Sequence, residues 1–452
     1  MTVTLIFYGI VPVTLLFFRY FSPQRATLLA CLTAFLFLPQ LSTSLPIIPD
    51  YDRTTGAVYS IGLGVILFDI DRLRCLKLGW VDLPITVWCL SSFVASISND
   101  LGVYDGVVAS LQEVVAWGGP YLIGRLYFSS LEGIKRLAIG IFVGGLVYVP
   151  FCLYEIRMSP QLHKMFYGFY GGSFAQSIRY GGYRPMVFLS HGLEVGSWMA
   201  AAALVGIWLW KSKTIERIFG IPIQWLVVLQ CVVVVLVKST GSIILLAFGT
   251  LLMFISHWTK VAIFVWLIVF TVPAYLYFSA SGDMESEQVV AFVAENVNPE
   301  RAQSLGFRLE QEEVLSEKAR ERALFGWGGW DRFALYGDWD ARKISVTDSL
   351  WIIAFGTRGV LGLTSLMLFL LMPIIVVLIA YPVNTWTDKR LAPVVVLAMM
   401  LLLYTLDNLL NDMYIPIYII ASGGITGLVM GHAPRLQGRG LSAAESYFFH
   451  GK

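Results

Sequence analysis

The chain has 452 residues, of which 57% are hydrophobic and 14% are charged, and its formal net charge is +2. Soluble domains carry about a quarter charged residues, so this composition favours an integral membrane protein. The small net charge provides no basic field for nucleic acid, and the alternating ten-residue segments of a membrane β-barrel are absent from the sequence.

The apolar residues are concentrated in segments long enough to cross a bilayer. They predict an all-α polytopic membrane protein with about 12–13 transmembrane helices. Because Arg19 and Arg25 follow the first segment where a cleavage site would need small residues, we expect this segment to remain as an anchor. The predicted spans cover residues 3–18, 26–41, 56–69, 80–96, 106–124, 137–154, 186–210, 221–237, 241–256, 261–279, 359–381, 391–409 and 415–431.

Lysine and arginine alternate between the connections of these spans. Every second connection is basic, and cytoplasmic connections retain such residues, so the amino terminus is predicted outside and the carboxyl tail inside. The predicted division is 1–280 with ten spans and an outer loop at 156–185, 281–347 as an extracytoplasmic loop, 348–431 with the last spans, and 432–452 as a cytoplasmic tail.

The loop at 281–347 has a helical pattern of its own. About a third of its residues are charged, so it is a solvated segment. Asn298 is a suitable N-cap and Pro299 a suitable first helical residue, which predicts a helix from Pro299 to about Leu324. Gly326 stops this helix, and the glycines that follow favour a tight turn over a phosphate-binding loop.

Arginines are the first candidates for chemistry on the outer side. Guanidinium groups bind phosphate oxygens in a bidentate manner, so convergence of several of them predicts a pyrophosphate site. Alternatively, each is a solvated charge paired with a nearby glutamate. The candidates are Arg179, Arg184, Arg301 and Arg308.

Asp348 lies where the outer loop enters the membrane again. A carboxylate at that boundary is expected to be partly desolvated, and it is then able to accept a proton from an attacking hydroxyl. The alternative is a helix N-cap, for which Thr347 is a rival.

His191 and Glu194 lie three residues apart on one predicted helix face. They either take part in binding an acceptor or form a buried hydrogen-bonded pair. Two such ligands do not make a zinc site, so no metal is predicted.

Three patches of the sequence together resemble the bacterial O-antigen ligase and polymerase family, which are membrane glycosyltransferases of the GT-C type. The first is Arg179-Tyr180-Gly181-Gly182-Tyr183 followed by Ser190-His191-Gly192-Leu193. The second leads from Arg308 to Gly326-Trp327-Gly328, and Arg301 to Leu305 fits the same pattern. The third joins Asp348 to Gly359 across ten residues, with aspartate where the ligases have histidine.

The resemblance implies an inverting transfer from a glycan carried on undecaprenyl pyrophosphate to a glycan acceptor, in the bacterial inner membrane, with the site facing the periplasm or the cell exterior. It implies that the outer arginines bind the pyrophosphate without a cofactor and that Asp348 orients or deprotonates the acceptor. Trp327 and Trp330 are then sugar-stacking surfaces, or alternatively part of an interfacial aromatic belt.

Three activities remain open at this point. The aspartate in place of histidine favours a polymerase of exopolysaccharide or O-antigen repeats over a ligase that uses lipid A core as acceptor. A transporter of lipid-linked glycan would bind pyrophosphate without any chemistry, but the related halves and broken helices typical of transporters are not evident in the sequence.

Overall fold

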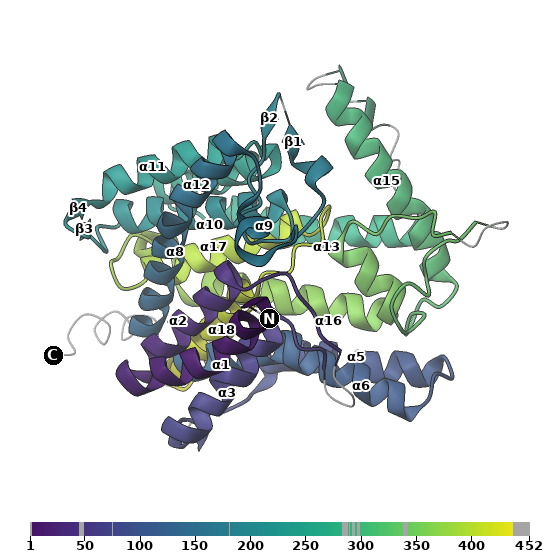
Figure 1. Ribbon diagram of the computed structural model, residues 1–452, viewed down its shortest axis with the longest axis horizontal. Helices are drawn as coiled ribbons and strands as arrows, with labels where there is room; N and C mark the ends of the chain where they lie inside the picture. The colour runs from purple at the N-terminus through teal and green to yellow at the C-terminus, as the bar shows by residue number, and fades with distance from the viewer. Residues whose placement is uncertain are drawn as a thin grey trace.

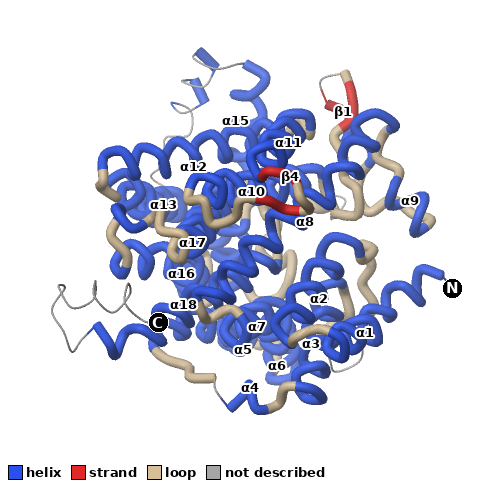
Figure 2. The backbone as a smooth tube through the Cα atoms, turned by 90° about the vertical axis from the view of Figure 1, so that its left-hand side faces the viewer, coloured by secondary structure: helices blue, strands red, loops and turns tan. Residues whose placement is uncertain are grey.

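The computed structural model describes residues 2–44, 49–74, 76–179, 181–282, 288, 290–291, 294–295, 299–337 and 342–436. Helices account for nearly all of the regular structure, and the strands of the described chain form two short antiparallel hairpins (Figure 2).

The elements of the first half end with the helix α10. In chain order they are α1 Thr2–Tyr20, α2 Pro23–Phe37, α3 Arg53–Phe68, α4 Asp71–Arg74, η1 Trp80–Asp82, α5 Leu83–Ser98, α6 Val103–Glu113, η2 Val114–Gly118, α7 Gly119–Tyr127, α8 Leu131–Met158, α9 Leu162–Tyr167, η3 Phe174–Ser177, β1 Ile178–Arg179, β2 Gly182–Tyr183 and α10 Gly192–Lys211.

The second half contains the other hairpin and the long kinked helix α16. Its elements are β3 Arg217–Ile218, β4 Ile221–Pro222, α11 Ile223–Leu236, α12 Thr240–Thr259, α13 Ile263–Ser281, α15 Pro299–Arg320, α16 Leu350–Ala380, η4 Val383–Thr385, α17 Ala392–Asp407 and α18 Pro416–Leu436.

Many of these helices are suited to a bilayer. Seven helical segments are long and apolar enough to span one, and α3, α11, α17 and most of α18 are shorter apolar helices. The structure therefore confirms the all-α polytopic class, and each predicted span coincides with helix. The most buried of them, α10 and α17, pack against each other at the centre of the bundle.

The predicted span 106–124 is divided by a π-helical turn, η2. Pro120 has no N–H group to donate to the carbonyl of Ala116 four residues earlier, so the α-helical pattern is interrupted there. The hydroxyl of Tyr414 donates to that carbonyl instead. The proline thus explains both the break and the contact with the α17–α18 connection.

The span predicted to begin at residue 186 begins at Gly192, because the preceding residues form a tight turn. The Glu155 carboxylate accepts hydrogen bonds from the amides of Met186 at 2.8 Å and Val187 at 2.7 Å. Val187 has a φ of 52°, which a β-branched residue adopts only when its surroundings enforce it. The turn holds the segment between β2 and α10 in one conformation.

The connections form two groups on opposite sides of the bundle. On the side we call outer, Asn99 donates to the carbonyl of Gly326 at 2.8 Å and Gln40 donates to that of Phe188 at 2.9 Å. On the inner side, Thr214 donates to the carbonyl of Lys389 at 3.3 Å. These are the groups that the charge alternation separates. In Figure 1, β1–β2 lies at the top and α15 at the upper right, and β3–β4 lies at the left.

The outer helix α15 begins at Pro299, as predicted, but it ends at Arg320 and a turn carries the chain to Gly326. The helix stops there because this turn docks on α16. The proposed cap Asn298 lies outside the described residues.

Two glycines join that turn to α16. Gly359 has a φ of 62° and breaks α16 into two helical halves. The amide of Val360 donates to the carbonyl of Ala323 at 2.7 Å, and the amide of Trp327 donates to that of Gly356 at 2.9 Å. Gly326 also has a positive φ, 70°, and the α16 backbone leaves no space for a Cβ atom at this residue. The glycines therefore serve backbone packing and a turn, the interpretation that the sequence favoured.

Candidate functional site

Arg308 joins α15 to the connection between α17 and α18. It is half-buried, and its Nη1 atom donates to the carbonyl of Leu410 at 2.8 Å and to Oδ1 of Asn411 at 2.9 Å. Its other guanidinium nitrogens donate no hydrogen bond to the described residues. One side of the guanidinium is thus fixed by the protein, and its remaining N–H groups are available to an anion.

Arg179 and Arg184 approach from the β1–β2 hairpin and the segment after it. Arg184 is buried, and its Nη2 atom donates to the carbonyl of Lys238 at 3.2 Å. Its Nε atom is buried without a hydrogen-bond partner. Burial, with the positive charge of Arg179 added, lowers the pKa of Arg184 to about 10. Arg184 therefore remains a cation at neutral pH, with a donor that no protein group satisfies.

His191 lies near enough to the arginines of α15 and of the hairpin for their charges to act on it. Burial and then the charges of Arg184, Arg179 and Arg308 lower the pKa of His191, against the effect of Glu194. The Nδ1 atom of His191 accepts from the amide of Leu193 at 3.0 Å, as the N-cap of α10. His191 is therefore neutral at pH 7 and carries its proton on Nε2, as a further donor. We call Arg179, Arg184, His191 and Arg308 the basic cluster.

None of the three arginines in the basic cluster forms an ion pair with a carboxylate of the described chain. The charges of Glu312 and Asp407 act on Arg308 without contacting it, so the guanidinium N–H groups are left able to bind a further anion. The glutamate ion pairs of the alternative interpretation are thus not seen for Arg179, Arg184 and Arg308 in the described chain, but Arg179 is exposed, as that interpretation expects. Arg301 lies in α15, and its side chain is outside the described residues.

Glu194 does not pair with His191, contrary to one of the alternatives drawn from the sequence. Its carboxylate accepts from the amide of Ser190 at 3.0 Å and from its hydroxyl at 2.7 Å, and it forms a buried ion pair with Arg53. Glu194 therefore ties the start of α10 to the start of α3.

Two further carboxylates approach each other beside the cluster. Asp348 is exposed, which contradicts the expected partial desolvation, and Ser349, not Asp348, occupies the N-cap position of α16. The side chain of Asp412 is exposed as well, although desolvation by the groups around it, and then the negative charge of Asp348, raise its pKa to about 6. No hydrogen bond from the described residues engages either carboxylate.

A polar cavity of about 380 Å³ adjoins these groups, and we call it the outer cavity. Two of its lining residues are adjacent in sequence to residues at the basic cluster. Ser190 precedes His191, and Asp412 follows Asn411, to which Arg308 donates a hydrogen bond. Its lining residues are Pro39, Gln40, Leu41, Ser42, Asp52, Arg53, Thr54, Ser190, Glu194, Asp412, Met413 and Tyr414.

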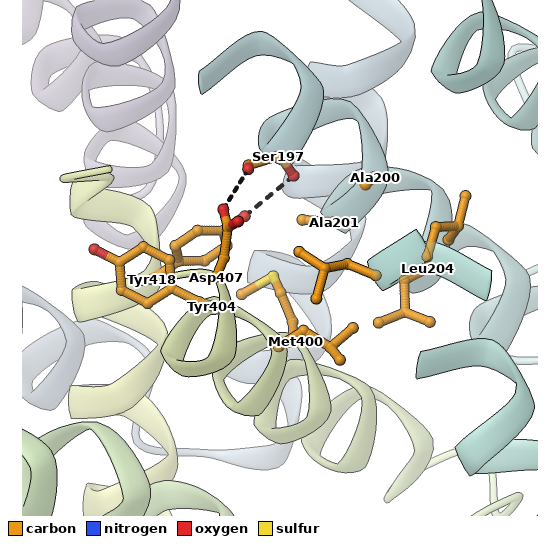
Figure 3. Close-up of a pocket in the computed structure, with 11 residues that line it drawn as sticks. Ser197, Ala200, Ala201, Leu204, Met400, Tyr404, Asp407 and Tyr418 are labelled. Carbon is orange, nitrogen blue, oxygen red and sulfur yellow. Dashed lines mark hydrogen bonds between the residues drawn. The ribbon is translucent and has the colours of Figure 1, made fainter. Parts of the chain in front are cut away.

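A second void lies deeper in the bundle, between α10, α12 and α17 (Figure 3). Asp407 points toward α10 there and accepts from the hydroxyl of Ser197 at 2.8 Å, and the Tyr418 hydroxyl donates to the carbonyl of Ser197 at 3.3 Å. Its volume of about 30 Å³ is enough for water but not for a sugar.

The two tryptophans of the outer loop differ in accessibility. Trp327 donates to the carbonyl of Lys318 at 2.9 Å, and the ammonium of Lys318 and the guanidinium of Arg322 lie 4.2 Å and 4.7 Å from its ring centroid. These cations occupy the ring of Trp327, whereas Trp330 is 66% exposed. Of the two, only Trp330 presents an open ring.

Sequence reasoning missed two residues of this region, Arg53 and Asp412. Arg53 is the single basic residue in its short outer connection. Such a lone charge beside apolar spans indicates a specific ion-pair partner, here Glu194. Asp412 follows Asn411 directly after an apolar span, where a carboxylate is expected to border lipid or a cavity.

Among the described residues, no three His, Cys, Asp or Glu side chains group in a way that could hold a metal ion. The chain matches no model of a known protein family and no curated protein.

Proposed function

We propose that this protein is an inverting glycosyltransferase that polymerises oligosaccharide repeats carried on undecaprenyl pyrophosphate, on the outer side of the bacterial cytoplasmic membrane. The observation that carries the proposal is the basic cluster, in which three guanidinium groups that form no ion pair with a described carboxylate lie near His191, beside membrane-spanning helices. Pyrophosphate carries the negative charge that arginines bind, and an apolar carrier would hold it at the membrane surface beside them.

In this mechanism an acceptor hydroxyl attacks the anomeric carbon of the donor from the face opposite the pyrophosphate. The new C–O bond forms as the bond to pyrophosphate breaks, and the electron pair leaves with undecaprenyl pyrophosphate. Arg308, Arg184 and Arg179 stabilise the charge that develops on that leaving group. The proton of the hydroxyl passes to one of the two carboxylates beside the cluster, either Asp348, which the sequence predicts, or Asp412.

The test is an assay of the purified protein in lipid nanodiscs with lipid-linked oligosaccharide. We expect longer glycans and free undecaprenyl pyrophosphate, and we expect Arg308→Ala to reduce the rate by about 100-fold, the typical effect of removing one charge-stabilising donor. Arg157→Ala is the matched control, because Arg157 is an exposed arginine at the outer end of α8.

Three results would go against the proposal. Equal rates for wild type and Arg308→Ala would exclude Arg308 from the reaction. Transfer of the glycan to lipid A core would identify a ligase instead, and movement of the donor across the membrane without a new glycosidic bond would identify a transporter.

A further inference from the structure

The outer cavity is a half-polar concavity near the basic cluster, and nothing in the proposed function so far assigns it a ligand. Its volume of about 380 Å³ is within the range of about 300–1,000 Å³ typical of small-molecule sites. Its polar lining includes Gln40, Ser42, Asp52 and Asp412, which offer both donors and acceptors. Such a lining suits a ligand that is rich in hydroxyl groups.

The hydrogen bonds that fix the cavity walls leave other donor and acceptor atoms of the lining side chains available to a ligand. Asp52 caps α3 through a single oxygen, which accepts from the amides of Thr54 at 2.7 Å and Thr55 at 2.8 Å. Gln40 donates through Nε2 to the carbonyl of Phe188 at 2.9 Å, which leaves its carbonyl oxygen available. The cavity is therefore preorganised and still able to bind.

The position of Asp412 distinguishes it from Asp348. Asp412 lines the cavity, whereas Asp348 does not. Asn411, the neighbour of Asp412, is held by Arg308 at 2.9 Å. A hydroxyl that reaches Asp412 from inside the cavity is therefore next to the site where Arg308 would hold the donor pyrophosphate.

We infer that the outer cavity binds the terminal sugar of the acceptor glycan and that Asp412 accepts the proton of the attacking hydroxyl. This inference rests on the proposed function, since it assigns the second substrate of that reaction. The proton moves from the hydroxyl to the Asp412 carboxylate while its oxygen forms the bond to the anomeric carbon. The electron pair of the broken bond leaves on the pyrophosphate.

The pKa of Asp412, raised to about 6, suits this role. Above that pH the carboxylate is ionised and able to accept a proton, so the rate is expected to rise as the pH increases through about 6. The other charged or titratable groups around it belong to the neighbouring elements, and they are Asp52, Arg53, His191, Glu194, Arg308, Asp348, Tyr404, Asp407 and Tyr414.

The test uses a soluble probe so that binding of the acceptor is measured independently of binding of the donor. A fluorescent aryl glycoside of the native repeat has no pyrophosphate, so it serves only as acceptor, while lipid-linked oligosaccharide serves as donor. We expect Ser42→Trp, which fills the cavity from an exposed loop position, to raise KM for the glycoside at least tenfold without changing KM for the donor. Ser98→Trp, at an exposed position at the outer end of α5 that does not line the cavity, is the control and should match wild type.

Asp412→Asn tests the proton acceptor. We expect kcat to fall about 100-fold, with both KM values retained and the rise of rate through pH 6 lost. Asp348→Asn should keep a rise but move it to lower pH, because the negative charge of Asp348 contributes to the raised pKa of Asp412. Wild-type acceptor KM in Ser42→Trp, or the wild-type pH profile in Asp412→Asn, would overturn the inference. In either case the wild-type protein still extends the glycoside, whereas failure of the proposed function means that no extension occurs at all.

Discussion

Glu312 is a buried carboxylate of the outer loop whose charge state is expected to affect stability. It lies on α15 and accepts from the hydroxyl of Tyr275 on α13 at 2.9 Å. Burial raises its pKa above the ordinary value of 4.5. The folded protein thus holds this proton more tightly than the unfolded chain does, so ionisation of Glu312 destabilises the fold as the pH rises through the raised pKa.

We therefore expect Glu312→Gln to gain stability relative to wild type as the pH increases. The measurement is the apparent Tm of both proteins in detergent, by tryptophan fluorescence, at pH 5 and at pH 8. The variant loses one acceptor at every pH, so the informative quantity is the change in the Tm difference. A difference that stays constant between the two pH values would show that Glu312 does not titrate in this range.

The two carboxylates of the site, Asp348 and Asp412, differ in how far the sequence alone predicts their positions. The position of Asp348 in the sequence placed it correctly at the entry to α16, but the direction of its side chain depends on packing, and it is exposed. The carboxylate that lines the outer cavity, Asp412, belongs to a connection of few residues that carries no motif. Hydrophobic periodicity finds spans, and it contains no information on which short connection closes over a cavity.

At the scale of elements, the joint between the α15 turn and α16 depends on glycine. Gly359 has φ 62° and ψ −159°, a region that only glycine occupies without strain, and a Cβ atom there would lie 2.5 Å from the carbonyl oxygen of Ala323. We expect Gly359→Ala to cost about 1–3 kcal/mol from the backbone alone, with the steric clash in addition.

The measurement for Gly359→Ala is the apparent Tm and the monodisperse fraction in size-exclusion chromatography. Gly62→Ala is the matched control, since Gly62 lies in α3 with nothing within 4 Å of its Cβ position. We expect the control to equal or exceed wild type because alanine favours a helix. A Gly359→Ala protein as stable as this control would rule out the proposed role of the joint.

The elements themselves were predictable where hydropathy determines them. Every predicted span is helical, but the periodic pattern could not locate the start of α10, which Glu155 fixes from another helix. Nor could it show the break in α6–η2–α7, which follows from Pro120 and the hydroxyl of Tyr414. The first depends on a side chain far away in the sequence, and the second on a proline within the span together with a distant tyrosine.

For the whole molecule, the two groups of connections predict which residues are accessible from each side of the membrane. Ser173 and Glu310 belong to the outer group and Asp71 and Lys213 to the inner group, and all four are exposed. In a background without reactive native cysteines, we expect a membrane-impermeant maleimide added to intact spheroplasts to label cysteine at the outer pair and to leave the inner pair unlabelled.

Permeabilised cells are the control for this labelling, because all four positions should then react. Labelling of Asp71→Cys or Lys213→Cys in intact cells would reverse the orientation inferred from the basic connections. It would also place the basic cluster on the cytosolic side, where the proposed acceptor would be absent.

The joint at Gly359 has a consequence for motion. The carbonyl groups of Ala323 and Leu324 complete the first turn of the second half of α16, so detaching them would leave amides unsatisfied next to lipid. The loop is therefore anchored firmly at its carboxyl-terminal end. Backbone amide exchange is therefore expected to be slowest at this end of the loop.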